Sequence, residues 1–144
     1  MTDLHVVAAA RLRADSQRYT TNRRAVVELL EASDRPLSIP QMLADRKDLA
    51  QSSVYRNLVV LEEAGVVRRI VTNDEFSRYE LAEDLTGHHH HLICSKCGAV
   101  DDFTVSPALE AEIEKVLKRV AKRHEFAIDG HRLDLIGACA DCNI

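Results

Sequence analysis

The segment HHHHLICSKCG, residues 88–98, places four histidines directly before a Cys-x-x-Cys pair. Imidazole nitrogens and thiolates are ligands that zinc and related transition metals prefer. This short stretch therefore offers six potential ligands. It indicates that the chain binds metal, and that it does so in two different ways.

A second Cys-x-x-Cys pair stands near the end of the chain, so the cysteines are Cys94, Cys97, Cys139 and Cys142. Two such pairs predict a tetrahedral four-cysteine zinc site, which is closed and therefore structural. The alternatives are disulfides of a small secreted domain or a thioredoxin-like redox site. Because the N-terminus has no apolar signal segment and a redox site needs only one pair, structural zinc is the prediction.

The histidine run has a geometric consequence if it forms a strand. Successive side chains of a strand point to opposite faces. His88 and His90 would then face one way, and His89 and His91 the other, so one segment could serve two separate ion sites. The alternatives are a solvated polar stretch and a remnant of a purification tag.

The composition limits the classes of function. A chain of 144 residues fits one domain or two small ones, and a net charge of −4 argues against a polycation that binds nucleic acid along its whole length. Positive charge gathers locally, because residues 11–24 hold five arginines against one acid, Asp15. No apolar run approaches the roughly 18 residues of a membrane span. We expect a cytoplasmic protein without membrane contact.

The first half of the chain predicts three helices and a hairpin. Apolar residues recur at helical spacing after Thr21, a plausible N-cap, and Ser38-Ile-Pro-Gln41 has the form of a capping box. A third helix should begin at Ser52 or Ser53 and end before Gly65. The strands VVRRIVT and FSRYEL follow, with a turn at residues 73–74. This order is that of a winged helix-turn-helix, whose third helix enters the DNA major groove.

The third helix has an apolar stripe that leaves polar residues outside. With the stripe turned inward, Ser53, Arg56 and Asn57 face outward and Tyr55 lies at the border. Such side chains contact phosphates and base edges in DNA complexes. The alternative is an ordinary solvated helix face.

The second half predicts a small α/β unit after a polar linker at residues 82–87. HHHHLIC and AVDDFTV look like strands, Ser106-Pro107 opens a long helix to about His124, and AIDGHRLDLIGA is a further strand. This unit would leave an unpaired sheet edge, which a second copy could cover in a C2 dimer. The predicted class is α+β, with a winged helix-turn-helix over residues 1–84 and an α/β dimerisation domain with the four-cysteine zinc site over residues 85–144.

From Arg18 to Cys142 the chain resembles the ferric uptake regulator (Fur) family of metal-dependent repressors. The motifs that carry the resemblance are YTTNRRAVVELL, SSVYRNLVVLEEAGVV, HHHHLICSKCG, EIEKVLKRVAKRHEF and GHRLDLIGACADC. The resemblance implies a homodimer in which a bound metal stabilises the arrangement that binds operator DNA. It implies a transcriptional regulator of metal-ion homeostasis genes and not an enzyme.

The resemblance also implies metal ligands. The regulatory site carries over to His88, His90, Glu114 and His131, with Glu110 and Glu112 as competing choices for the carboxylate. This donor set suits Fe(II), Zn, Mn or Ni and does not select among them.

A second site of the family maps to Glu80, His91 and Asp102, with His89 nearby. The histidine that the family usually adds from the N-terminal domain would fall near Pro36, where this chain has none. The hinge cysteine and aspartate of zinc-sensing relatives correspond to Ala82 and Arg68, which weakens an assignment as a zinc sensor.

For DNA, the resemblance implies base readout by Tyr55. It implies further DNA contacts by Ser52, Ser53, Arg56, Arg18 and Arg23. Ser52 and Ser53 would lie near the bases, and Arg56 on a phosphate. Arg18 would enter the minor groove and Arg23 would contact the backbone.

Two other functions stay open. One is a peroxide-sensing repressor on the same scaffold, in which Fe(II) oxidises its own ligand histidine. The other is a zinc hydrolase or deaminase, but the His-Glu-x-x-His and His-x-Glu patterns of such enzymes do not occur in this sequence.

Overall fold

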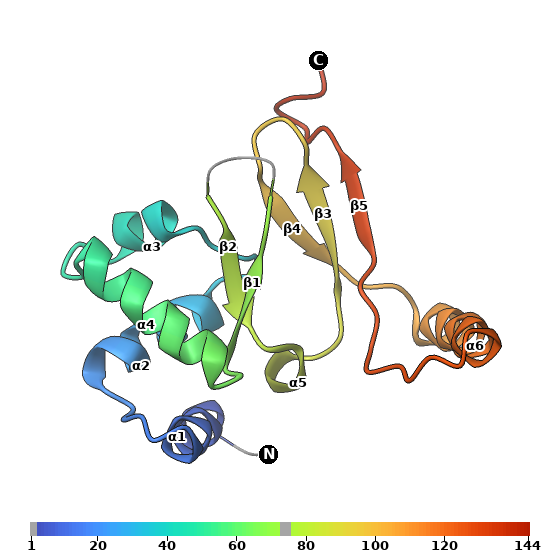
Figure 1. Cartoon of the computed structure of the whole chain (residues 1–144). Coiled ribbons are helices and arrows are strands. Elements are labelled where there is room, and N and C mark those ends of the chain that lie inside the picture. Colours follow the sequence, from blue (N-terminus) through green and yellow to red (C-terminus); the bar gives the residue numbers. More distant parts are fainter. Residues whose placement is uncertain (1–2, 73–75) are drawn as a thin grey trace.

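The structure, a computed structural model, describes residues 3–72 and 76–144. Its elements are α1 (Leu4–Ala14), α2 (Thr21–Ala32), α3 (Ile39–Asp45), α4 (Gln51–Glu63), β1 (Val67–Ile70), β2 (Arg78–Leu81), α5 (Glu83–Thr86), β3 (His90–Cys94), β4 (Val100–Phe103), α6 (Pro107–Arg123) and β5 (Asp134–Gly137). β1 and β2 form one sheet, and β4, β3 and β5 form a second in that order. Figure 1 shows α1 to α4 on one side of the β1-β2 hairpin and the second sheet on the other. The expected α+β class is confirmed.

The core of the protein lies almost entirely in the first half of the chain. Helices α2 and α4 pack on each other and on the hairpin through fully buried side chains such as Val26, Leu58 and Leu61. Burying a side chain of this kind stabilises a fold by roughly 1.5–3 kcal/mol. In the second half, the only buried apolar residues among those that the structure describes are Cys94, Val100 and Ala121. The second half therefore needs another source of stability.

The helix starts agree with the sequence at two positions and differ at two others. The capping box of Ser38 and Gln41 is present, and Ser106 caps α6 by accepting a hydrogen bond from Leu109 N–H. The cap of α2 is Thr20, one residue before the predicted Thr21. Helix α4 begins after Ala50, without a side-chain cap.

Ser53 does not cap α4 because its hydroxyl has another use. It accepts hydrogen bonds from Asn22 Nδ2 on α2 at 3.5 Å and from Asn57 Nδ2 at 3.3 Å. The serine thus helps to hold α4 against α2. Gly65 has a φ of +78° just after the end of α4, as the predicted C-terminal cap requires.

Two elements were not expected from the sequence. Helix α1 precedes the predicted helices, and its buried residues are Ala8 and Leu12, too few to give a clear apolar stripe. The predicted linker at residues 82–87 is also not irregular, because it contains the short helix α5 and ends at Gly87 with a φ of +112°. The predicted turn at residues 73–74 lies outside the described residues.

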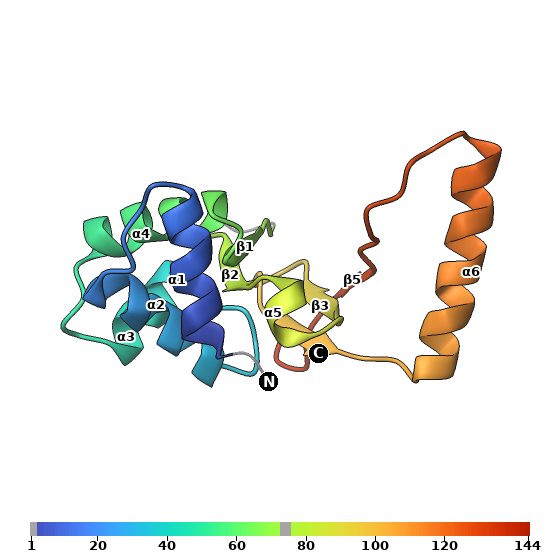
Figure 2. The ribbon, with the colours of Figure 1, turned by 90° about the horizontal axis from the view of Figure 1, so that it is seen from below.

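The second sheet has one antiparallel and one parallel pairing. β3 runs antiparallel to β4 and parallel to β5, with Cys94 opposite Gly137. β5 is an edge strand, and Leu135 and Ile136 on it are 54% and 70% exposed. Figure 2 shows α6 standing apart from this sheet. Val116 and Val120 of this helix are exposed. None of the helices within the described ranges is long and apolar enough to cross a membrane.

Candidate metal centres and DNA-binding surface

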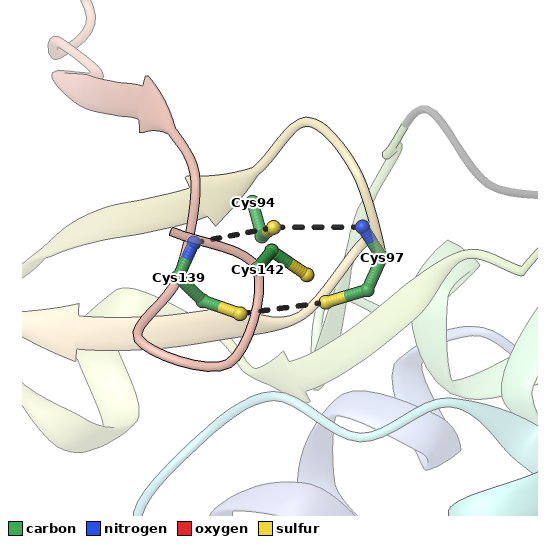
Figure 3. Close-up of side chains that lie close together, drawn as sticks. All are labelled: Cys94, Cys97, Cys139 and Cys142. Carbon is green, nitrogen blue, oxygen red and sulfur yellow. Dashed lines mark hydrogen bonds between the residues drawn. The ribbon is translucent and has the colours of Figure 1, made fainter. Parts of the chain in front are cut away.

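The four cysteines converge because β3 and β5 are parallel. Parallel strands end at the same edge of a sheet, so the two Cys-x-x-Cys pairs that follow them meet there (Figure 3). The four sulfur atoms lie within 4.8 Å of one another, and Cys97 Sγ and Cys139 Sγ are 3.7 Å apart. A tetrahedral zinc ion with Zn–S bonds of about 2.3 Å would separate sulfurs by about 3.8 Å. The geometry is consistent with a structural zinc site.

The surroundings of the sulfur atoms favour ionisation of the Cys94 thiol and oppose ionisation of the Cys142 thiol, as their pKa values show. The backbone N–H groups of Cys97 and Cys139 donate to Cys94 Sγ at 3.5 and 3.3 Å and lower the pKa of Cys94 to about 6. The interaction with Cys139, together with burial, raises the pKa of Cys142 to about 12. Four thiolates in one place require a cation, and a divalent metal supplies it.

A second group of ligands gathers at the opposite end of β3 and β5. His88 and His90 come from the start of β3, and His131 precedes β5. All three Nε2 atoms approach the carboxylate of Glu110, at 2.8, 2.8 and 2.9 Å. His88 Nε2 and His131 Nε2 are 3.2 Å apart, and imidazoles around a tetrahedral ion would be separated by about 3.3 Å. We call this group the first cluster: His88, His90, Glu110 and His131.

The structure favours a different carboxylate for this group from the one predicted first. Glu110, in the first turn of α6, carries the ligand atom within reach of the three histidines, and Glu114 does not. Glu114 lies one helical turn further along α6 and lines the same depression from outside the cluster. The spacing to His124 and His131 predicts Glu114, with Glu110 and Glu112 as competing choices, and the geometry favours Glu110 because α6 starts at Pro107 and its first turn lies beside the histidines.

The environment of the first cluster suits a cation. His90 is 1% exposed, and its Nδ1 is buried without a hydrogen-bond partner among the described residues. Hydrogen bonding to His90 lowers the pKa of Glu110, so the carboxylate is ionised at neutral pH. His88 Nδ1 contacts Glu83 of α5, a residue that sequence reasoning missed. Nothing in the local spacing around Glu83 marks it as a partner of a histidine five positions later.

The second cluster consists of Glu80, His89, His91 and Asp102, the set expected from the resemblance. It joins β2 of the hairpin to β3 and β4 of the second sheet, and His91 lies opposite Asp102 in the sheet register. Glu80 contacts His89 Nε2 at 2.8 Å and His91 Nε2 at 3.1 Å. The alternation of the histidine run between two faces is thus observed: His88 and His90 belong to one cluster, and His89 and His91 to the other.

The charge of Glu80 is stabilised strongly. Burial opposes its ionisation, but hydrogen bonds from His91, Arg68 and His89 outweigh burial and lower the pKa of Glu80 to about 2. Burial lowers the pKa of His89, yet the hydrogen bonds to Glu80 and to the Gly87 carbonyl raise it above its ordinary value. Burial raises the pKa of Asp102.

The candidate DNA-binding residues lie on or beside α4. Tyr55 is 59% exposed, and Ser52, Arg56 and Arg18 are exposed as well. Ser53 and Asn57, which were also expected to face outward, are half-buried and hydrogen-bonded to residues of α2. Asn57 Oδ1 accepts a hydrogen bond from Arg23 Nε at 3.1 Å, and Arg23 Nη1 donates to the Arg18 carbonyl. These bonds hold the Arg23 side chain of α2 against α4, whose exposed candidates are Ser52, Tyr55 and Arg56.

Comparisons with known proteins agree with this architecture. A model of the ferric uptake regulator family matches residues 14–136. The ferric uptake regulation protein of Bacillus subtilis is 37% identical over 138 residues, which cover 92% of this chain and 89% of that protein. The peroxide-responsive repressor PerR of Staphylococcus saprophyticus is 33% identical over 135 residues, covering 91% and 86%. The solved structure of the Helicobacter pylori ferric uptake regulator Fur, described as revealing three functional metal-binding sites, aligns with a TM-score of 0.74 at 28% identity and covers 100% of this chain and 98% of that one.

Proposed function

The chain belongs to the ferric uptake regulator family of metal-responsive transcriptional repressors, and we propose that the ion controlling it binds the first cluster. The convergence of three imidazole Nε2 atoms on the Glu110 carboxylate carries this proposal. Three nitrogens and one carboxylate suit Fe(II), Zn, Mn or Ni. We propose zinc for the four-cysteine site, because four thiolates in a closed tetrahedral arrangement are typical of structural zinc.

The first cluster lies where it can control the position of the winged helix. His88 follows Gly87 at the end of α5, so an ion held by His88, Glu110 and His131 fixes where the chain leaves the second sheet. His88 Nδ1 contacts Glu83, and Glu83 Oε2 lies 3.9 Å from Arg68 of β1. A carboxylate behind a metal-bound histidine orients the ring, so ion binding has a direct path to the hairpin.

We propose that the chain acts on operator DNA as a homodimer, with residues 1–84 as the DNA-binding domain and 85–144 as the dimerisation domain. The exposed apolar side chains of β5 and α6 support this, because a second copy would cover them. Two winged helices must match half-sites about one helical turn, roughly 34 Å, apart or multiples of it. The ion is then an effector that favours the arrangement able to bind DNA. The family is one of transcriptional regulators, so we propose a regulatory and not a catalytic role, in the cytoplasm where operator DNA is found.

The test of this function is a variant of the first cluster. His131→Ala should retain the cysteine-bound zinc and the dimer but lose metal-dependent operator binding, since one of three imidazoles is removed. His88→Ala should have the same effect, and it also removes the imidazole that contacts Glu83. Operator affinity is measured by fluorescence anisotropy with and without added Mn(II), Fe(II), Zn or Ni.

His124→Ala is the matched control for these variants. His124 is exposed at the end of α6 and belongs to neither cluster, so its loss should leave the metal response unchanged. If His131→Ala still requires added metal to bind its operator, the controlling ion lies elsewhere, with the second cluster as the first place to look.

We expect two different effects from substitutions on α4. Arg56→Ala should weaken binding to all duplexes and lower the salt dependence by about one released counterion, as the loss of a phosphate contact does. Tyr55→Ala should cost about 1–3 kcal/mol against the operator and little against random DNA, as lost base readout does. Lys115→Ala on α6 removes the same charge away from α4 and serves as the control. Wild-type operator affinity in both α4 variants would move the DNA contact to another surface.

A peroxide-sensing repressor is the second candidate function, favoured by the 33% identity to a peroxide-responsive repressor. It has a distinct signature. Hydrogen peroxide would release the Fe(II)-loaded protein from DNA, but not the Mn(II)-loaded protein, and a histidine of the iron site would gain one oxygen atom in mass.

A further inference from the structure

The second cluster differs from the first because it contains a cation of its own. Arg68 lies opposite Glu80 in the β1-β2 register. It donates to Glu80 Oε1 from Nε, at 3.0 Å, and also from Nη2. The Glu80 side chain is 8% exposed and that of Arg68 25%, so water screens this pair little. In the first cluster, by contrast, the recorded ion-pair partners of Glu110 are its three histidines.

The guanidinium changes the charge that an incoming ion would meet. Glu80 and Asp102 bring two negative charges to the cluster, and the guanidinium of Arg68 offsets one of them. A divalent ion bound to Glu80 would also lie close to a fixed positive charge on the same carboxylate. Such a repulsion is strong in a buried site, where the effective dielectric constant is low.

The oxygen atoms of Glu80 are already used. Oε1 receives both donors of Arg68 and lies 3.1 Å from His91 Nε2. Oε2 lies 2.8 Å from His89 Nε2 and 3.2 Å from His91 Nε2. A carboxylate has about four acceptor positions, and two N–H groups of Arg68 occupy two of them whatever the tautomers of the histidines. The carboxylate therefore has its partners without a metal ion.

The contacts of Glu80 also connect two parts of the chain. Glu80 and Arg68 belong to the hairpin, whereas His89 and His91 belong to the second sheet. Another contact with the second sheet, from Arg35 between α2 and α3 to Asp101 at 3.3 Å, joins side chains that are both more than half exposed. An exposed pair of this kind contributes little, whereas the group around Glu80 is largely buried.

We propose that Arg68 is the permanent counter-ion of the second cluster. It takes the place of a metal ion there. Glu80, His89 and His91 then connect the hairpin to the second sheet through contacts that do not depend on metal. The metal response of this protein is thereby left to the first cluster alone. This inference rests on the proposed role of the first cluster, but its test counts bound ions and does not use DNA.

The experiment is a titration with Co(II) of protein that keeps its cysteine-bound zinc. Wild type should bind one Co(II) per protomer, and His131→Ala should abolish that binding while His89→Ala leaves it unchanged. Arg68→Ala should bind a second Co(II), which the double variant Arg68→Ala/His89→Ala loses. Arg69→Ala is the matched control, because this neighbour on β1 pairs with Glu62 at 3.8 Å and should leave the count at one.

Three results would overturn the proposal or separate it from the proposed function. Two Co(II) ions on wild type, reduced to one by His89→Ala, would show that the cluster accepts metal despite Arg68, and this comparison holds even if Arg68→Ala does not fold. A folded Arg68→Ala variant that still binds one ion would show that the arginine does not keep metal out. If His131→Ala does not lower the number of bound Co(II) ions, the proposed metal-binding role of the first cluster is contradicted instead. An added ion in Arg68→Ala that depends on His89 would still support the role of Arg68.

Discussion

Replacing Cys142 with serine should release the cysteine-bound zinc and destabilise the second half of the chain. Apart from Cys94 itself, the buried apolar residues there, among those described, are Val100 and Ala121, so little apolar burial remains to hold the sheet. Structural zinc contributes about 10–16 kcal/mol of apparent binding energy in small zinc domains, and that energy is folding energy. This is comparable to the roughly 5–15 kcal/mol by which ordinary domains are stable, so we expect the sheet not to persist without zinc.

The measurement combines zinc content with limited proteolysis of residues 85–144. Asp141→Ser is the matched control, because Asp141 lies in the same Cys-x-x-Cys loop, is exposed and contributes no ligand atom to the cysteine group. Cys97→Ser should reproduce the effect of Cys142→Ser. Retention of wild-type zinc content and of a protease-resistant second half in both cysteine variants would falsify the four-cysteine zinc site.

The features that the sequence predicted well depend on short-range geometry. A strand places alternate residues on opposite faces, so His88 and His90 separate from His89 and His91 wherever the strand lies. The spacing within each cysteine pair is likewise local. That the two pairs meet depends on a parallel pairing of β3 with β5, which the sequence suggested only through its β-α-β order.

The features that the sequence predicted poorly depend on how separate segments dock. The choice between Glu110 and Glu114 changes with the residue at which α6 approaches the strands, because the two lie one turn apart on the same helix. The pairing of Arg68 with Glu80 depends on the register of β1 with β2, which the strand patterns do not set by themselves. The pattern of α4 also does not show that Ser53 and Asn57 form hydrogen bonds with residues of α2, because those partners come from a separate segment.

Replacing Glu110 with glutamine should lower the affinity of the regulatory ion by roughly 100-fold or more, whereas Glu114→Gln should leave it near the wild-type value. Changes in groups that only support a ligand already cost about 10–100-fold, and Glu110 is proposed to be a ligand itself. The substitution keeps the shape of the side chain but removes the negative charge on which the three imidazoles converge. It also places an amide N–H₂ group toward the imidazole nitrogens, where a metal ion needs their lone pairs.

The comparison of these two variants tests the geometry more sharply than the loss of a histidine does. Both remove one carboxylate from the same face of α6 and both line the same depression, so a general effect of charge on ion binding would appear in both. Only a directed ligand bond distinguishes Glu110 from Glu114. Affinity is measured by calorimetric titration with Mn(II) on protein that keeps its cysteine-bound zinc. Equal losses in the two variants would mean that the acidic face attracts the ion without Glu110 binding it, and a larger loss in Glu114→Gln would restore the residue predicted from the sequence.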